Sequence, residues 1–424
     1  MFINLNNILI HVKDIIHTDT AKQTISLYFS EIVVILLSVV IGIINTRSLG
    51  PEGFGIFALF ITITSFTVIF FRFGIFSSAS ALLAYIKDEQ KEKEMVGAII
   101  LLTFLIGIIY AIFLFILSFF VDSIFNSNIG WMLRWFSILS IALPYTLVIS
   151  LIGRGTNQIH AISMYNIIRP LFYIVGALVV LSVVTISQSD FILLYLISVN
   201  VAVIISLYYF RPKFTHLKEN VSAIFKKTKE YGLDLYIGQI ADQGTTQLIS
   251  LLIPIFVNST ELGFFTLATY ITGPMSTFSR SLSVTRFKHF AHSEGISRKI
   301  IFYNAIWLTF CVFILFLFGS LIINTFFGNQ FSPAITLLLP LSIAGFFAGM
   351  YQPYNLFLSV KMKGKWLRNM SFIMSVVSIL GCILVIPKYG TVGAAMVTIC
   401  ANGTFFLTCL FYYYKYLKEV SNGS

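Results

Sequence analysis

The sequence predicts an all-α integral membrane protein with about twelve transmembrane helices, in two six-helix lobes related by a pseudo-two-fold axis along the membrane normal. Composition, the length of the apolar runs and an internal repeat predict this fold. Of the 424 residues, 57% are hydrophobic and 11% are charged, against roughly a quarter charged in soluble domains. The apolar runs of about twenty residues favour spanning helices over the short alternating strands of a membrane β-barrel.

Twelve apolar segments are each long enough to cross about 30 Å of hydrocarbon as a helix. They are residues 25–46, 54–76, 95–121, 131–152, 161–185, 191–210, 234–257, 262–284, 300–323, 334–358, 369–386 and 392–412. Ahead of the first segment, apolar residues recur at steps of three and four, which predicts a short amphipathic helix on the cytoplasmic surface. These residues are Phe2, Leu5, Leu9, Val12 and Ile16.

The basic residues predict that both termini are cytoplasmic. With the N-terminus inside, 22 Lys and Arg residues lie in inside segments, and two, Arg47 and Lys388, lie in outside loops. Such an excess is typical of cytoplasmic loops, so the net charge of +11 reflects orientation rather than binding to nucleic acid. The outside loops, of about ten residues at most, leave no room for an external catalytic domain.

The two halves of the chain repeat one another. Gly55 to Leu59 (GIFAL) matches Gly263 to Leu267 (GFFTL) at an offset of 208 residues, and PYTLVIS from Pro144 matches PYNLFLS from Pro353 at an offset of 209. We therefore predict an N-terminal lobe of residues 1–210 with the amphipathic N-terminus, a cytoplasmic basic linker of residues 211–233, and a C-terminal lobe of residues 234–424.

Six spans per half give both halves the same orientation. In such repeats the substrate site lies between the lobes, and rocking of the lobes gives alternating access. Duplication without transport, as in a scaffold, is the alternative interpretation.

Three arginines within the predicted spans are candidates for substrate binding: Arg72, Arg280 and Arg169. An unpaired charge in the membrane costs at least about 2.5–3.5 kcal/mol, so lipid-facing positions are disfavoured. Arg72 and Arg280 share the 208-residue offset and each lies 17 residues beyond its repeat glycine, which predicts equal depth on the cytoplasmic side. Their guanidinium groups would bind phosphate bidentately across a cavity between the lobes.

Structural interpretations of these arginines remain open. Arg72 and Arg280 could snorkel to the inner interface, with Arg280 closer to it. Arg169 precedes Pro170 and could pair with a carbonyl freed by a proline kink. Arg134, near the outer interface, could be an interface anchor.

The seventh predicted span is unusually polar. Gln239, Asp242 and Gln243 share one face at helical spacing, and Asp234 precedes them. With Glu31 in the first span, they are candidates for a polar cavity face, and Asp242 is the candidate for proton or cation coupling. A structural pair between Asp242 and an arginine is the alternative.

No enzyme chemistry is indicated. The sequence has no phosphate-binding loop, nucleophile elbow or dinucleotide fingerprint, so we expect no catalytic residues and no cofactor. The four cysteines lie in apolar spans without metal-ligand spacing, and the histidine pair His289 and His292 lacks the pattern of a zinc helix, so no metal site is predicted. Transport would have to draw on an ion gradient or on the substrate's own gradient.

Two segments resemble a known family. The run RSLGPEGFG resembles the first external loop of the Wzx-type polysaccharide flippases, in the multidrug/oligosaccharidyl-lipid/polysaccharide (MOP) exporter superfamily. Its motif residues are Arg47, Gly50, Pro51, Glu52 and Gly55. PKYGTVGAA, from Pro387 to Ala395, opens the last predicted span and is similar to the family's corresponding segment. Arg72 departs from the pattern, because an acidic or neutral residue is expected before Phe73 and Gly74.

The resemblance implies a MATE-like fold and export of undecaprenyl-pyrophosphate-linked oligosaccharide units, such as O-antigen of lipopolysaccharide or capsule, across the bacterial inner membrane. The implied partners are the lipid-linked oligosaccharide, membrane lipids and other glycan-assembly membrane proteins. One alternative is a drug or cation antiporter of the same superfamily. The other is a membrane glycan polymerase or ligase, which would be expected to carry a large external loop.

Overall fold

The computed structural model describes residues 19–183, 187–286, 290 and 293–423. Within these ranges, the side chains of residues 19–30, 183, 231, 234, 235, 242, 422 and 423 are not described. The predicted amphipathic segment from Phe2 to Ile16 lies outside the described residues. All regular secondary structure in the described ranges is helical, which confirms the predicted fold class.

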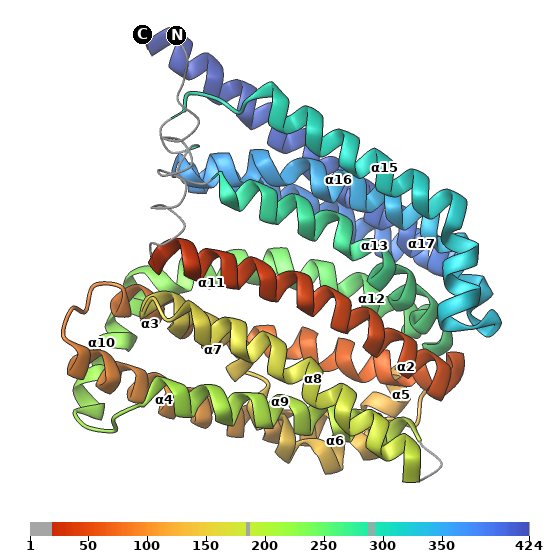
Figure 1. Cartoon of the computed structure of the whole chain (residues 1–424), viewed down its shortest axis with the longest axis horizontal. Coiled ribbons are helices and arrows are strands. Elements are labelled where there is room, and N and C mark those ends of the chain that lie inside the picture. Colours follow the sequence, from red (N-terminus) through yellow and green to blue (C-terminus); the bar gives the residue numbers. More distant parts are fainter. Residues whose placement is uncertain (1–18, 184–186, 287–289, 291–292, 424) are drawn as a thin grey trace, which may run out of the picture.

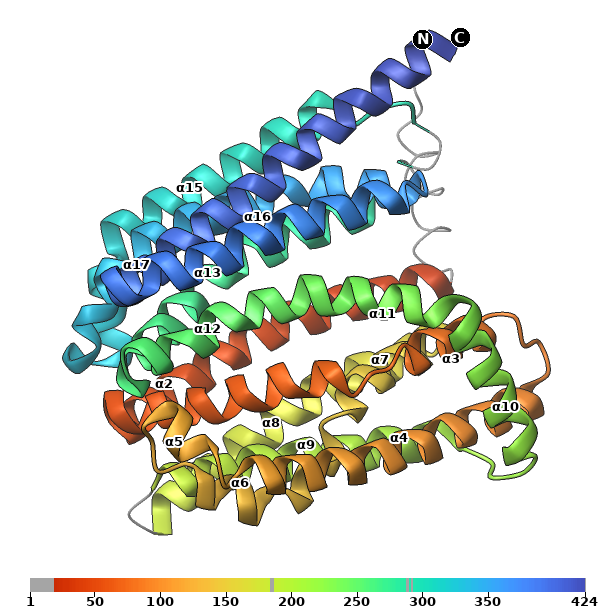
Figure 2. The same ribbon diagram turned by 180° about the vertical axis from the view of Figure 1, so that it is seen from behind.

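The first half of the chain begins with a 52-residue helix, α2, which would be about 78 Å long if straight. It contains a break at Gly50, whose φ of 65° is favourable only for glycine, and Pro51 then starts the second segment. Figures 1 and 2 show that the chain reverses its direction at this point. The helices of this half are α2 (Asp19–Phe70), α3 (Ile75–Leu83), α4 (Glu89–Leu117), α5 (Val121–Phe125), α6 (Gly130–Phe136), η1 (Ile138–Ala142), α7 (Tyr145–Gly155), α8 (Ile159–Val183) and α9 (Gln188–Phe210).

The second half ends with a similar hairpin, α17, which breaks at Gly390 with a φ of 56°. Three of its short helices, η2, η3 and η4, are π-helical, and η5 is a 3-10 helix. The elements are α10 (Leu217–Lys227), η2 (Thr228–Gly232), α11 (Leu233–Gln239), η3 (Ile240–Gly244), α12 (Thr245–Phe256), α13 (Ser259–Thr285), α15 (Arg298–Ile322), η4 (Ile323–Phe327), η5 (Asn329–Ala334), α16 (Ile335–Val360) and α17 (Gly364–Gly423).

Among the described residues, eight helices are long and apolar enough to cross a membrane, and α12 is a shorter apolar helix. Two of the eight are the hairpins α2 and α17, and their breaks fall where the sequence predicts boundaries between spans. The count of twelve crossings and the division into lobes at residues 210 and 234 remain predictions.

The helices form two groups that meet at α2 and α13. In Figure 1, α13, α15, α16 and α17 lie above, α4, α8 and α9 lie below, and α2 and α12 lie between them. α13 packs against both α2 and α16, and α2 packs against α8. α12 contacts both α2 and α17, and so joins elements from the two halves.

The basic linker predicted at residues 211–233 contains α10, which packs against α3 and α4. The amide of Lys213 donates to the Lys93 carbonyl at 2.9 Å, and the Thr215 hydroxyl donates to the buried carboxylate of Glu94 at 2.8 Å. These contacts attach the linker to the first half.

Candidate functional site

A cavity of about 980 Å³ lies between helices from the two halves of the sequence. Its walls come from α2, α8 and α9 on one side and from α13, α15 and η4 on the other. It extends along α2 from Glu31 to Asn45, a separation of 14 residues or about 21 Å in a helix. The cavity therefore extends across much of a bilayer's hydrocarbon thickness.

Three charged side chains line this cavity: Glu31, Arg169 and Arg280. Arg280 is exposed, and Glu31 accepts a hydrogen bond of 2.7 Å from the hydroxyl of Ser281, the next residue along α13. Arg169 is half-buried on α8, with its guanidinium carbon 5.9 Å from the centre of the Tyr165 ring. Among the described residues, the cavity lining thus holds two cationic groups and one acidic group.

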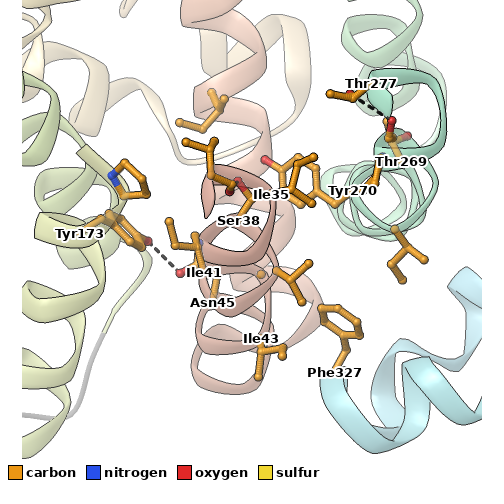
Figure 3. Close-up of a pocket in the computed structure, with 18 of the residues that line it drawn as sticks. Ile35, Ser38, Ile41, Ile43, Asn45, Tyr173, Thr269, Tyr270, Thr277 and Phe327 are labelled. Carbon is orange, nitrogen blue, oxygen red and sulfur yellow. Dashed lines mark hydrogen bonds between the residues drawn. The ribbon is translucent and has the colours of Figure 1, made fainter. Parts of the chain in front are cut away.

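The end of the cavity away from Glu31 is polar and ordered by hydrogen bonds. The Tyr173 hydroxyl donates to the side-chain oxygen of Asn45 at 2.8 Å, which joins α8 to α2 (Figure 3). Tyr270, on α13, lines the opposite wall. These three residues were missed by the sequence analysis, which looked for charges in the spans. The signal that could have found them is the presence of uncharged polar residues within apolar runs.

The cavity walls are otherwise mainly apolar. Ile35, Ile41 and Ile43 line it from α2, and Phe327 lines it from η4 (Figure 3). Pro170 on α8 and Pro274 on α13 also belong to the lining, within helices that continue past them. Charge in such surroundings is poorly hydrated, so Arg169 would interact strongly with an anionic group.

Arg72 is in different surroundings from Arg280 and is not among the lining residues of this cavity. It follows the end of α2, in a non-helical turn, and donates a hydrogen bond to the side-chain oxygen of Gln243. Nearby, the Tyr236 hydroxyl donates to the Phe70 carbonyl at 2.7 Å. The two repeat-related arginines are therefore not brought together around the described cavity.

The predicted polar face of the seventh span is interrupted by the π-helical turn η3. Gln239 donates to the Ser77 hydroxyl at 3.3 Å, and Gln243 accepts from Arg72, so both amides contact residues from the region around the end of α2 and α3. Neither amide is among the residues lining the cavity. The side chains of Asp234 and Asp242 lie outside the described parts of the structure.

The family-motif loop joins the two halves at the end of the cavity near Asn45. Arg47 donates from Nε to the Phe326 carbonyl at 2.8 Å and from Nη2 to the Thr325 carbonyl. Gly50 forms the break in α2, Pro51 begins the next helical segment, and Glu52 is exposed. A Cβ added to Gly55 would lie 2.2 Å from the Ser259 carbonyl oxygen, so the backbones of α2 and α13 are in direct contact there.

Comparison with known proteins gives one family and several solved structures. The family model described as "Polysaccharide biosynthesis protein" matches residues 20–279. A search of curated proteins found no match.

The solved structures that match include a flippase and several membrane transporters. The lipid II flippase MurJ in an inward closed conformation has a TM-score of 0.67 and 17% identity over 94% of this chain and 89% of MurJ. An inward-facing MATE family multidrug resistance transporter of the MOP superfamily has a TM-score of 0.71 and 14% identity over 92% of this chain and 96% of the transporter. A MOP superfamily transporter from Pyrococcus furiosus gives 0.62 and 13% over 94% of each chain. At these identities the matches establish a shared fold.

Proposed function

The chain belongs to the polysaccharide biosynthesis protein family and shares its fold with the flippase MurJ and with MATE transporters. From this premise we propose that it is a multi-pass membrane transporter of the flippase type and that it exports an undecaprenyl-pyrophosphate-linked oligosaccharide unit. The product would be O-antigen, capsule or a related glycan. The proposed location is the bacterial inner membrane, with both termini in the cytoplasm, because the inside segments carry the excess of basic residues.

The observation that carries this proposal is the presence of Arg169 and Arg280 in the lining of one cavity between the two halves. Among the described residues, neither arginine forms an ion pair within 4 Å. Arginine binds phosphate oxygens through a planar fork and remains protonated in apolar surroundings. Two such groups suit a pyrophosphate, and the polar groups of Asn45, Tyr173 and Tyr270 could hydrogen-bond to sugar hydroxyls.

The size and lining of the cavity are also consistent with such a substrate. Its volume of about 980 Å³ lies at the upper end of the range for small-molecule sites, which suits a diphosphate carrying sugars. The lipid tail would remain in the bilayer while the headgroup crosses between α2 and α13. Alternating opening of the two ends would move the headgroup without ATP hydrolysis by this chain.

Asp242 remains the proposed ion-coupling residue, and Arg72, Gln239, Gln243, Asp234 and Glu31 remain proposed members of the polar pathway. For Arg72 and Gln243, this role requires that their mutual hydrogen bond breaks during transport. Glu31 lines the cavity and accepts a hydrogen bond from the Ser281 hydroxyl.

A drug or cation antiporter is the second candidate, because the fold is shared with MATE multidrug transporters. A site for cationic drugs would be expected to carry mainly acidic groups. The described lining holds two arginines and one glutamate, which favours an anionic substrate.

The experiment replaces Arg169 with Ala in a strain that lacks the chromosomal gene. We expect surface glycan to fall by roughly ten- to over a hundredfold at unchanged protein level, because a charge-assisted contact contributes about 1.5–3 kcal/mol. Lipid-linked oligosaccharide should accumulate in the cells. Surface glycan is measured by gel and lectin blot, and the lipid-linked pool by mass spectrometry.

Arg134→Ala is the matched control. Arg134 is also an arginine within the predicted spans, but it stacks on the Phe119 ring at 4.1 Å and does not line the cavity. Normal export by Arg169→Ala would remove this residue from the site. If deletion of the gene leaves surface glycan unchanged and increases drug sensitivity, the flippase proposal is wrong and the antiporter is favoured.

A further inference from the structure

We propose that Arg47 and the contact between Gly55 and Gly263 hold the external end of the cavity closed, and that these contacts must separate for substrate to leave. We call Arg47, Gly55, Gly263 and Phe331 the outer seal. The inference rests on the proposed transport function, to which it adds the residues that control the exit.

Arg47 is bound to the end of a helix from the other half of the sequence. η4 ends at Phe327 and the chain turns away at Gly328, whose φ is 104°, so the last carbonyl groups of this helix cannot all bond within it. Arg47 donates to two of these carbonyls, Thr325 and Phe326, and its positive charge is favourable beside a helix C-terminus. The next residue, Phe327, lines the cavity, so this contact lies directly at the cavity's end.

Gly55 and Gly263 bring two backbones together. A Cβ on Gly263 would lie 3.1 Å from the Cα and the nitrogen of Gly55, and a Cβ on Gly55 would lie 2.2 Å from the Ser259 carbonyl oxygen. Both obstacles are main-chain atoms, which cannot rotate away as a side chain could. Any side chain at position 55 must therefore push α13 away from α2.

Phe331 fills the space beside this contact. Its fully buried ring packs edge-to-face against Phe54 at 5.9 Å and against Phe264 at 6.0 Å between ring centres. Phe54 comes from the first half and Phe264 from the second, so the aromatic cluster also joins the two halves. The outer seal thus combines a polar contact, a backbone contact and an apolar cluster.

The repeat explains why the closing contact occurs at these glycines. Gly55 and Gly263 occupy equivalent positions at the offset of 208 residues. A residue and its symmetry equivalent can touch only close to the axis that relates them, as in a two-fold dimer interface. A contact on the axis between rocking halves is where the halves must part to open that end of the cavity.

The test measures access to the cavity from the sealed side. Ser38, which lines the cavity from α2, is replaced by Cys in a protein whose four native cysteines are replaced by alanine. Cells or proteoliposomes are treated with a membrane-impermeant maleimide. Asn128→Cys, on the exposed loop before α6, serves as the reference, and the reagent is applied to the side from which that cysteine is labelled.

We expect slow labelling of Ser38→Cys in the parent protein and at least about tenfold faster labelling when Arg47→Ala is added, since two charge-assisted hydrogen bonds are lost. Arg47→Lys should give an intermediate rate, because a single ammonium group cannot reproduce the fork. Gly55→Ala should give the fastest labelling. Gly238→Ala is its control, because a Cβ there meets no atom within 4 Å.

Three results would overturn the proposal: fast labelling in the parent, equal labelling in the parent and Arg47→Ala proteins, or equal effects of Gly55→Ala and Gly238→Ala. If Gly55→Ala does not fold, Arg47→Ala still tests the proposal, because the Arg47 side chain is exposed and its removal leaves the packed core intact. The labelling does not require the natural substrate. A normal surface glycan in the gene deletion, together with faster labelling of Arg47→Ala, would therefore refute the proposed substrate and leave the outer seal standing.

Discussion

Two contacts between glycines bring together distant parts of the sequence, one near each end of the second segment of α2. Gly55 meets the start of α13, and both helices of this contact line the cavity. Gly74 meets Gly232 at the beginning of α11, and neither residue lines the cavity. The two backbone contacts therefore have different roles. The contact at Gly55 closes a pathway, and the contact at Gly74 attaches the linker to the first half.

The two contacts also differ in backbone conformation. Gly74 has a φ of 70°, which an L-residue rarely adopts, whereas Gly55 lies within the helical part of α2. Substitution of Gly74 therefore strains the backbone at that position itself, whereas substitution of Gly55 is resisted because α13 lies against it.

The largest expected effect on stability comes from Gly74→Ala. A Cβ there would lie 2.2 Å from the Gly232 carbonyl oxygen, and the left-handed backbone adds about 1–2 kcal/mol. We expect a lower Tm in detergent and a reduced amount of folded protein, both measured by size-exclusion chromatography after heating. Gly238→Ala should not lower the Tm, because alanine is favoured over glycine within a helix and its Cβ meets no atom within 4 Å. A Tm for Gly74→Ala equal to that of the parent would remove the distinction between the two contacts.

An intermediate effect is expected for the two repeat-related arginines, which lie in different surroundings. Arg280→Ala should reduce surface glycan by about ten- to a hundredfold at unchanged protein level, and Arg280→Lys should retain part of the activity. Arg72→Ala should also reduce export if its bond to Gln243 opens during transport. If Arg72, once released from Gln243, contacts the same phosphate as Arg280, the double variant should be less than additive.

Full additivity of the two arginine variants would indicate that Arg72 acts independently of the phosphate that Arg280 contacts. If Arg280→Lys exports glycan normally, and Arg280→Ala lowers protein abundance rather than export, then Arg280 is a snorkelling residue. Both outcomes are read from glycan blots at matched protein level.

The smallest expected effect is that of Asp242→Asn, in the π-helical segment that also carries Gln243. We expect slower transport, by several-fold, and a changed dependence on the proton or sodium gradient, because a neutral amide cannot carry a coupled charge. Uptake by inverted vesicles with and without ionophores measures this. Unchanged rates and unchanged ion dependence would make Asp242 a structural residue.

Much of the fold was predictable from the sequence because the bilayer permits few solutions. Backbone groups in hydrocarbon must bond within the segment, so apolar runs of about twenty residues become helices. The predicted boundaries beside Gly50 and Gly390 coincide with breaks, because glycine adopts a positive φ at low cost. The cost of a charge in lipid likewise explains why Arg169, Arg280 and Glu31 line a cavity.

Other features of the site could not be predicted from the sequence. Equal spacing from the repeat glycines predicted equal depth for Arg72 and Arg280, on the two sides of one cavity. In the structure α2 ends at Phe70, before Arg72, whereas α13 continues through Arg280 to Thr285. The π-helical turn η3 changes the helical period within one turn, so Gln239 and Gln243 could not be placed from a spacing of 3.6 residues.

The contact of Gly55 with Gly263 also bears on how the chain could have arisen by gene duplication. In a half-length ancestor that paired in parallel with a second copy of itself, a single glycine would have formed both sides of this contact. Each mutation of that residue would then have altered the interface twice. After fusion of two such genes, positions 55 and 263 could mutate independently. The presence of glycine at both positions is consistent with a separate requirement for close backbone approach at each one.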